Sequence, residues 1–151
     1  CAGCSTLESM AWNLAGFSGQ VCAAMDARRH QIYNARFQVD GQCPRRLTPD
    51  RAISLDDLVQ ELAGTQTPQL VVGDGAQLCY DALTAAGIPA VLAPPNLRMQ
   101  SAWGVARQAL ALAQAGQTLS PAQLVPVYHR LSQAERERLE REQAAQTPHP
   151  Q

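Results

Sequence analysis

The sequence of 151 residues predicts an α/β protein in which helices flank a mixed β-sheet. Two observations favour this class. Residues 21–39 have a period of two residues on both sides of a short charged segment, which is typical of a β-hairpin. From residue 54 onwards, short apolar runs alternate with amphipathic helical patterns, as expected where helices pack on a sheet.

The first expected element is a helix that begins after Ser5. Ser5 and Glu8 have the spacing of a capping box, in which the serine caps backbone N–H groups and the glutamate reaches back. Gly16 lies near the expected end of the helix. The apolar residues at helical spacing are Leu7, Met10, Ala11, Leu14 and Ala15.

The hairpin follows, with strands on either side of residues 26–30. A tight hairpin turn needs only Asn-Gly or Asp-Gly, but this turn contains an acid, two arginines and a histidine. A solvated charged turn is one interpretation, and a functional turn is the other. We expect Asp26 and Arg28 to brace the turn, with Arg29 and His30 more exposed.

The remaining elements are expected in the order strand, helix, strand, helix, strand, helix. Residues 43–53 contribute a short third strand, and a helix runs from Ser54 towards Gly64. Residues 69–72 form an apolar strand that turns through Gly73-Asp74-Gly75 into a helix ending at Gly87. A buried strand spans residues 90–93, and a helix spans residues 101–115. Its expected inward residues are Ala102, Val105, Ala106, Ala109, Leu110 and Ala113.

Three leading strands followed by alternating helices and strands make a ribonuclease-H-like layout. That layout is also one lobe of the actin/hexokinase type of fold. From residue 132 the sequence is polar nearly all round a helical repeat, which predicts a polar helical or disordered tail over 132–151.

Charge and composition narrow the function classes. A net charge of −1 gives no overall attraction to phosphate backbones, which disfavours a stand-alone RNA binder but not a subunit beside an RNA-binding partner. No apolar run approaches the roughly 20 residues that span a bilayer. The chain has five cysteines, an odd number. The lack of such an apolar run and the odd number of cysteines favour a cytoplasmic protein with small thiols over a membrane or disulfide-linked one.

Several groups of residues resemble redox, metal or phosphate sites, but each group is weak or incomplete. Cys1 and Cys4 have redox or zinc spacing, but a second pair for zinc is absent. His30, His129 and His149 form no metal-ligand pair at helical spacing, and the carboxylates do not cluster as two-metal nucleases require. The Gly73–Gly75 turn has the position of a phosphate site, but a structural tight turn is the favoured interpretation. We therefore expect no metal-dependent catalysis and no cofactor.

Five segments, in order, resemble motifs of the TsaB (YeaZ) family, whose members help to make threonylcarbamoyladenosine on tRNA. The hairpin is similar to the family's "AAxDARxxEVY" segment, although the family often has glycine where His30 stands. The family's opening "LAIDTS" strand and "GPGSFTGLR" loop do not occur here, so the chain looks like the C-terminal two-thirds of such a protein. The other similar segments are residues 4–8 (CSTLE), 71–76 (VVGDGA), 93–98 (APPNLR) and 125–131 (VPVYHRL).

The resemblance implies a division into the last helix of a missing first lobe (1–18), a ribonuclease-H-like second lobe (19–131) and the tail (132–151). It implies a non-catalytic scaffold that pairs with a TsaD-like subunit and a TsaE-like ATPase, and meets tRNA only indirectly. A glycoprotease-like hydrolase or acyltransferase of the same fold, and a thiol-redox module, remain alternatives. The family-signature positions, of open role, are Asp26, Arg28, Tyr33, Gly73, Asp74, Gly75, Arg98, Tyr128 and Arg130.

The missing first lobe also predicts an exposed apolar surface on this chain. We expect the stripe formed by Leu7, Met10 and Leu14 to be exposed where the first lobe would pack, and to favour a homodimer.

Overall fold

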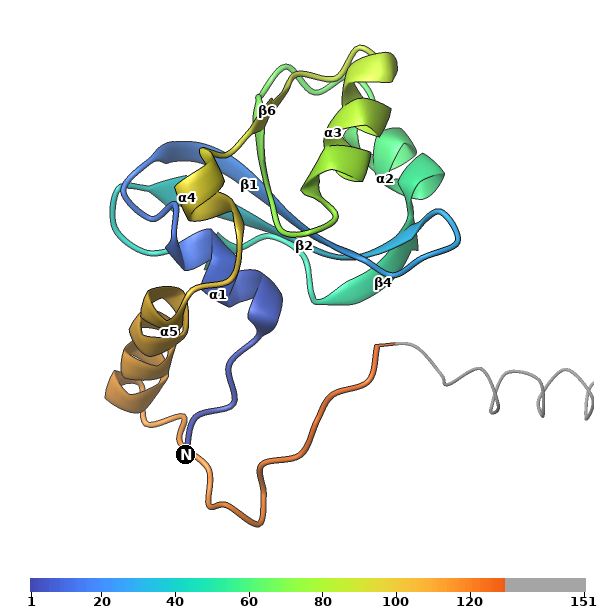
Figure 1. Cartoon of the computed structure of the whole chain (residues 1–151). Helices are drawn as coiled ribbons and strands as arrows, with labels where there is room; N and C mark the ends of the chain where they lie inside the picture. Colours follow the sequence, from blue (N-terminus) through green and yellow to red (C-terminus); the bar gives the residue numbers. More distant parts are fainter. Residues whose placement is uncertain (130–151) are drawn as a thin grey trace, which may run out of the picture.

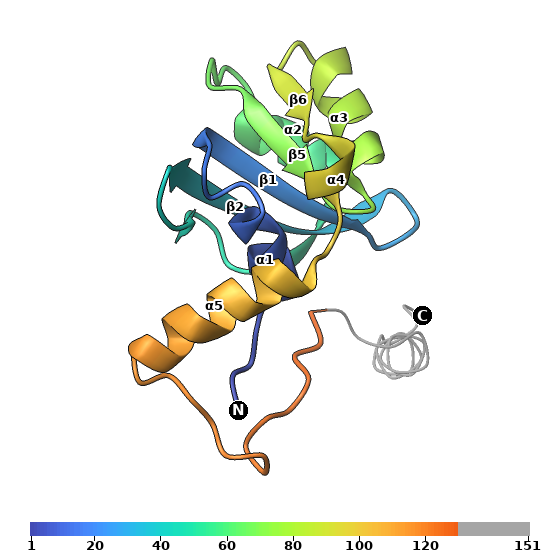
Figure 2. The same cartoon turned by 60° about the vertical axis from the view of Figure 1, so that its left-hand side comes forward.

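The structure, a computed structural model, describes residues 1–129 and contains a six-stranded mixed sheet with helices on both faces (Figures 1 and 2). The strands are β1 (Ser18–Asp26), β2 (Gln31–Asp40), β3 (Arg45–Arg46), β4 (Arg51–Ser54), β5 (Gln69–Val72) and β6 (Ala90–Leu92). The helices are α1 (Thr6–Trp12), α2 (Leu55–Leu62), α3 (Ala76–Ala85), α4 (Pro95–Arg98) and α5 (Ala102–Gln114).

The strand order β3-β2-β1-β5-β6 confirms the ribonuclease-H-like fold class. β1 and β2 form the expected antiparallel hairpin, with Ser18 opposite Asp40 and Asp26 opposite Ile32. β5 pairs with β1, and β6 with β5, in parallel. The carboxyl ends of β1, β5 and β6 therefore lie at one edge of the sheet, where the hairpin turn and the Gly73–Gly75 turn also lie.

Each face of the sheet has its own apolar core. On one face, α1 packs against alternate residues of β1 and β2, among them Val21, Phe37 and Val39. On the other face, α2 and α3 cover the residues between them, among them Cys22 and Ile32. The central strands are buried on both sides, which is why β1 reads as a nearly continuous apolar run.

The expectation that α1 exposes an apolar stripe is wrong. Leu7 is 4% exposed, and Met10 and Leu14 are fully buried, because this helix face packs onto the sheet of the same chain. The regular helix ends at Trp12, and a turn continues to Phe17. The predicted homodimer therefore loses the surface on which it was based.

The prediction of which face of α5 points inward is also wrong. Val105 and Leu110 are 43% and 50% exposed, and the buried residues are Gly104 and Gln108. α5 packs on α1 rather than on the sheet, and lies at the outside of the molecule in Figure 2. Glycine at position 104 permits this approach, because a Cβ there would lie 2.1 Å from the carbonyl oxygen of Ser9.

The structure also differs from the sequence prediction in smaller ways, which concern the edges of the sheet. The expected third strand is divided into β3 and β4, which both pair with β2. β6 is an edge strand in which Val91 is 50% exposed, so it is not the buried strand that the sequence predicts. The short helix α4 was not expected from the sequence.

An ion-pair network connects β2 and β4 to α2. Arg36 and Arg51 both donate to the carboxylate of Glu61, over 2.8 and 2.7 Å. Burial would raise the pKa of Glu61, but the bonds from the two guanidinium groups outweigh it and hold that pKa below its ordinary value.

Arg130 and the tail 132–151 lie outside the described residues. Within residues 1–129, no helix has the length and apolar character needed to cross a membrane.

Candidate functional site

The turn after β5 holds the start of α3 directly against β1. Gly73 has φ +105°, and a Cβ at this position would lie 2.0 Å from the carbonyl oxygen of Ala24. The Gly75 N–H donates to that same oxygen over 3.1 Å. A Cβ on Gly75 would lie 2.9 Å from the backbone nitrogen of Asp26. Glycine is thus required at both positions by close backbone contact.

Two signature acids and an arginine complete this junction. The Asp74 carboxylate accepts a hydrogen bond of 3.3 Å from the Asp26 N–H, which ties the turn to the end of β1. Arg98 donates from its guanidinium to Ala93 O over 2.9 and 3.1 Å, and its own carbonyl accepts from Gly73 N over 2.8 Å. The junction therefore joins the ends of β1, β5 and β6.

The geometry of this turn favours a structural role over phosphate binding. The N–H groups of Gly73, Gly75 and Ala76 all donate to backbone carbonyls within the fold. A phosphate site at a helix N-terminus uses free N–H groups, and these three are already bonded.

The hairpin turn has an unusual backbone. Arg28, Arg29 and His30 have φ of 61°, 54° and 58°. The Gln31 N–H donates to Arg28 O over 3.1 Å, which places Arg29 and His30 at the centre of a turn with two positive φ angles, as in a type I′ turn. The Asp26 carboxylate accepts from Arg28 N over 2.7 Å.

Asp26 therefore braces the turn as expected, whereas Arg28 contributes its backbone. All three side chains at positions 28–30 are exposed. The glycine that the family often has at the position of His30 suits the positive φ found there.

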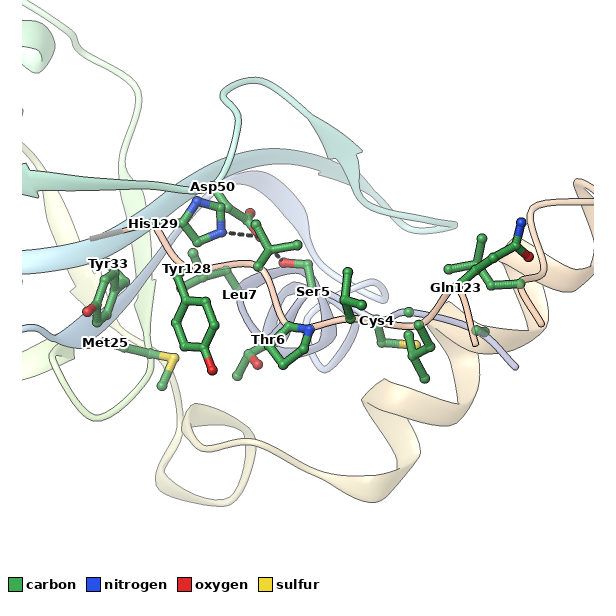
Figure 3. A pocket seen from close by; sticks show the side chains of 17 residues that line it. Cys4, Ser5, Thr6, Leu7, Met25, Tyr33, Asp50, Gln123, Tyr128 and His129 are labelled. Carbon is green, nitrogen blue, oxygen red and sulfur yellow. Dashed lines mark hydrogen bonds and ion pairs between the residues drawn. The ribbon is translucent and has the colours of Figure 1, made fainter. Parts of the chain in front are cut away.

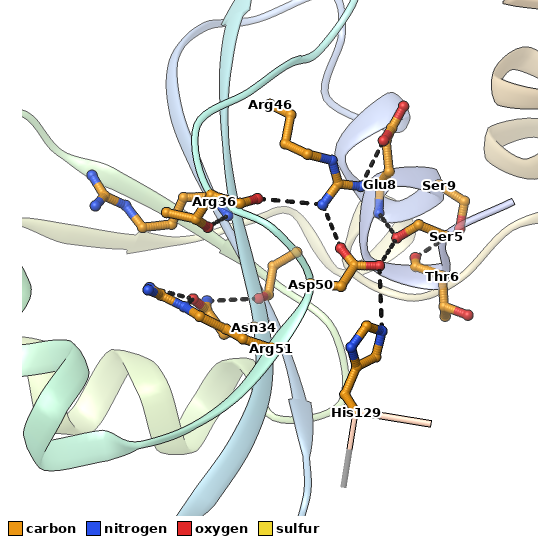
Figure 4. Close-up of polar contacts among 12 residues, drawn as sticks. Ser5, Thr6, Glu8, Ser9, Asn34, Arg36, Arg46, Asp50, Arg51 and His129 are labelled. Carbon is orange, nitrogen blue, oxygen red and sulfur yellow. Dashed lines mark hydrogen bonds and ion pairs between the residues drawn. The ribbon is translucent and has the colours of Figure 1, made fainter. Parts of the chain in front are cut away.

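A second polar cluster lies between α1 and the loop before β4 (Figure 4). Arg46 donates to the Glu8 carboxylate over 2.7 Å and also to Asp50. Burial opposes the charge of Arg46, but its bonds to Asp50 and Glu8 outweigh burial and hold its pKa above the ordinary value. The capping box is only half formed, because Glu8 pairs with Arg46 instead of reaching back to the backbone of Ser5.

In this cluster a serine, an aspartate and a histidine lie near one another without the contacts of a hydrolase triad. The Ser5 hydroxyl donates to Asp50 Oδ2 over 2.6 Å and accepts from Glu8 N as the N-cap of α1. His129 Nε2 lies 4.0 Å from that same carboxylate oxygen. In a triad the imidazole would contact the serine, and here the carboxylate does so.

A cavity of about 920 Å³ lies beside this cluster, between the N-terminal residues and the segment 119–129 (Figure 3). Its walls are largely apolar, and the signature residues Tyr33 and Tyr128 both line it. The Cys1 N–H group and carbonyl oxygen bond to Leu119 over 2.9 and 2.8 Å, so the two segments are held together at one end.

All five cysteines are free thiols. The hydrogen bond with Cys79 lowers the pKa of Cys22, but this thiol is fully buried in the core. Burial and the nearby Glu8 charge raise the pKa of Cys4, which opposes thiolate formation. The Cys22 and Cys79 sulfurs lie 3.7 Å apart in the core, where their mutual hydrogen bond and burial raise the pKa of Cys79. Among the described residues, no group of three or more His, Cys, Asp and Glu side chains is placed to hold a metal ion.

The structure thus divides the signature positions into two groups. Asp26, Gly73, Asp74, Gly75 and Arg98 meet at the carboxyl edge of the sheet, with Arg28 on the adjoining turn. Tyr33 and Tyr128 line the cavity. Sequence reasoning missed Arg46 and Asp50, because nothing in their local pattern indicates that they meet a serine and a glutamate about 40 positions away.

Comparison with known proteins agrees with the motif resemblance. The chain is 29% identical over 135 residues to the tRNA threonylcarbamoyladenosine biosynthesis protein TsaB of Bacillus subtilis. The resemblance to TsaB is confirmed. The match covers 87% of this chain and 56% of TsaB, so the chain spans little more than half of that relative. No protein-family model matches the chain.

Solved structures described as YeaZ share the fold. YeaZ from Pseudomonas aeruginosa superposes with a TM-score of 0.60 at 18% identity, covering 83% of this chain and 58% of that one. A protein described as having similarity to peptidase YeaZ from Pseudomonas aeruginosa also gives a TM-score of 0.60 at 18% identity, covering 84% and 57%.

Proposed function

We propose that the chain is the second lobe of a TsaB-type protein and takes part in threonylcarbamoyladenosine synthesis on tRNA. The observation that carries this proposal is the similarity to TsaB over 135 residues. In the proposed division, residues 1–18 are the last helix of a first lobe, 19–131 are the second lobe, and 132–151 are a polar tail.

The proposed role is that of a non-catalytic scaffold. It would pair with a TsaD-like subunit and, through that pair, with a TsaE-like ATPase, meeting tRNA only indirectly. The state of the candidate reactive groups supports this role. Ser5 is bonded to a carboxylate, the pKa of Cys4 is raised, and the Gly73 and Gly75 amides donate within the fold.

The test of the pathway is the nucleoside content of tRNA. Cells depleted of the protein that contains this chain should lose threonylcarbamoyladenosine from their tRNA, as measured by liquid chromatography and mass spectrometry, and re-expression should restore it. An unchanged content after depletion would contradict the proposal.

The test of the scaffold role separates it from the hydrolase alternative. The purified protein should bind the TsaD-type subunit of the same organism in isothermal titration calorimetry and should not hydrolyse peptide or ester substrates by itself. Hydrolysis that is lost on Ser5→Ala would favour the catalytic alternative instead.

A further inference from the structure

We infer that the hairpin turn, residues 28–30, is a docking surface for an acidic peptide segment of a protein partner. This inference does not depend on the proposed function. It rests on the backbone of the turn, on its unpaired arginines and on a hollow beside it.

The backbone of the turn does not suit its residues. Three consecutive residues with side chains have positive φ, a region that is unfavourable for any residue that has a Cβ. A turn with positive φ at both central positions is formed without this cost by Asn-Gly, but here those positions are Arg29 and His30. Side chains that are retained in a conformation they disfavour point to a use for those side chains.

The charges of this turn are not used within the fold. The guanidinium groups of Arg28 and Arg29 are exposed and make no hydrogen bond or ion pair with any other residue in 1–129. By contrast, Arg36, Arg46 and Arg51 are each held by carboxylates. Two exposed guanidinium groups side by side in sequence can each donate a bidentate pair of hydrogen bonds to a carboxylate.

A hollow of about 260 Å³ lies beside the two arginines. It is lined by Asp26 and residues 28–31 together with Leu55 and Leu78, and Leu78 is 46% exposed. This volume admits one or two side chains rather than a large ligand. A cationic rim next to the exposed Leu78 side chain fits a peptide in which carboxylates neighbour apolar residues.

The surroundings favour a protein partner over RNA. This turn presents two exposed guanidinium groups, and the whole chain has a net charge of −1. Binding to a phosphate backbone requires several cations that follow the strand, whereas a short peptide segment needs only one or two carboxylates to pair with these arginines.

The inference is tested by nuclear magnetic resonance on the ¹⁵N-labelled protein. The probe is the peptide Ac-Glu-Leu-Glu-Leu-NH₂ at up to about 5 mM, a range that detects millimolar dissociation constants. We expect saturable shifts of the amide signals of residues 28–30 and Leu78. The same peptide with glutamine in place of glutamate should bind at least about fivefold more weakly, because it lacks the charge-assisted bonds.

Variants then assign the binding to the arginines. Arg28→Gln/Arg29→Gln should abolish the shifts at Leu78, while the matched control His30→Gly, which keeps both arginines, should retain them. Dispersed spectra will show that each variant is folded. The inference is overturned if the glutamate peptide causes no shifts, if the glutamine peptide binds equally well, or if the double variant still binds. Stronger shifts of the same signals by a short single-stranded RNA would overturn it in favour of nucleic acid.

Discussion

At the scale of single residues, the junction between β1 and α3 depends on the absence of a side chain. Gly73 and Gly75 let the turn after β5 contact the backbone of residues 24–26. An alanine at position 73 would have to adopt the positive φ that glycine has there. Its Cβ would also clash with a backbone oxygen that is itself fixed in the sheet. Only the first of these constraints applies at Gly41, Gly64, Gly87 and Gly116, where φ is positive but no atom lies within 4 Å of an added Cβ.

Gly73→Ala should therefore lower the free energy of unfolding by at least about 3 kcal/mol, since a backbone clash is added to the cost of positive φ. The matched control is Gly64→Ala, where φ is +77° but no atom lies within 4 Å of the added Cβ. That variant should lose only about 1–2 kcal/mol. Urea denaturation measures both values, and equal losses would contradict the close approach.

At the hairpin turn the expected change has the opposite sign. Arg29→Asn/His30→Gly supplies the residues that positive φ angles favour, so the free energy of unfolding should rise by about 1–2 kcal/mol. Thermal and urea unfolding of the variant provide the measurement. A variant less stable than the wild type would show that the side chains of Arg29 and His30 stabilise the turn.

Glu61 should make the stability of the protein depend on pH in the acidic range. Its pKa is lowered in the fold, so its contribution is present above its unfolded pKa of about 4.3 and is lost as the pH falls through the lower, folded pKa. Glu61→Gln should therefore be less stable than the wild type near neutral pH and lose less stability on acidification. Asp40→Asn, at an exposed carboxylate with no ion pair among residues 1–129, is the control. Parallel acid profiles for the wild type and Glu61→Gln would refute this role.

At the scale of elements, α5 is held by a contact that its sequence pattern does not suggest. The helix approaches α1 at Gly104, and the buried Gln108 donates to Ser5 O over 3.0 Å and accepts from Ser5 N over 3.1 Å when its amide is oriented to satisfy both groups. A side chain at Gly104 would collide with α1.

Gly104→Ala should thus destabilise the protein by about 2–3 kcal/mol despite the higher helix propensity of alanine. The control is Gly16→Ala, where nothing lies within 4 Å of the added Cβ and the change should stay within about 0.5 kcal/mol. Chemical denaturation compares the two variants. A Gly104→Ala protein as stable as the wild type would contradict the tight α1–α5 contact.

The elements also show which features the sequence predicts and why others escape it. The hairpin, α2, β5 and α3 were predicted because local periodicity and caps agree with their tertiary contacts, as at Ser54, which caps Asp57 N. The inward face of α5 was predicted wrongly because a glycine and a glutamine face α1, while the alanine-rich stripe faces outwards. The Glu8–Arg46–Asp50 cluster could not be predicted, because β3 and β4 are too short to fix its register.

At the scale of the whole molecule, several polar groups that the sequence offers for chemistry are engaged in holding the fold together. The carboxyl edge of the sheet is closed by backbone bonds, and Ser5 and Asp50 secure α1. The fold is that of YeaZ structures, and the sequence is similar to slightly more than half of TsaB. These features are the basis of the scaffold role that we propose.

The central claim is tested most directly by reconstituted threonylcarbamoyladenosine synthesis on tRNA. The reaction is run with the protein that contains this chain, with the TsaD-type subunit of the same organism, and with both, and the modified nucleoside is quantified by mass spectrometry. The account predicts no product from the protein alone and a higher yield from the TsaD-type subunit when the protein is present. Product formed by the protein alone, or a yield that its addition leaves unchanged, would contradict the account.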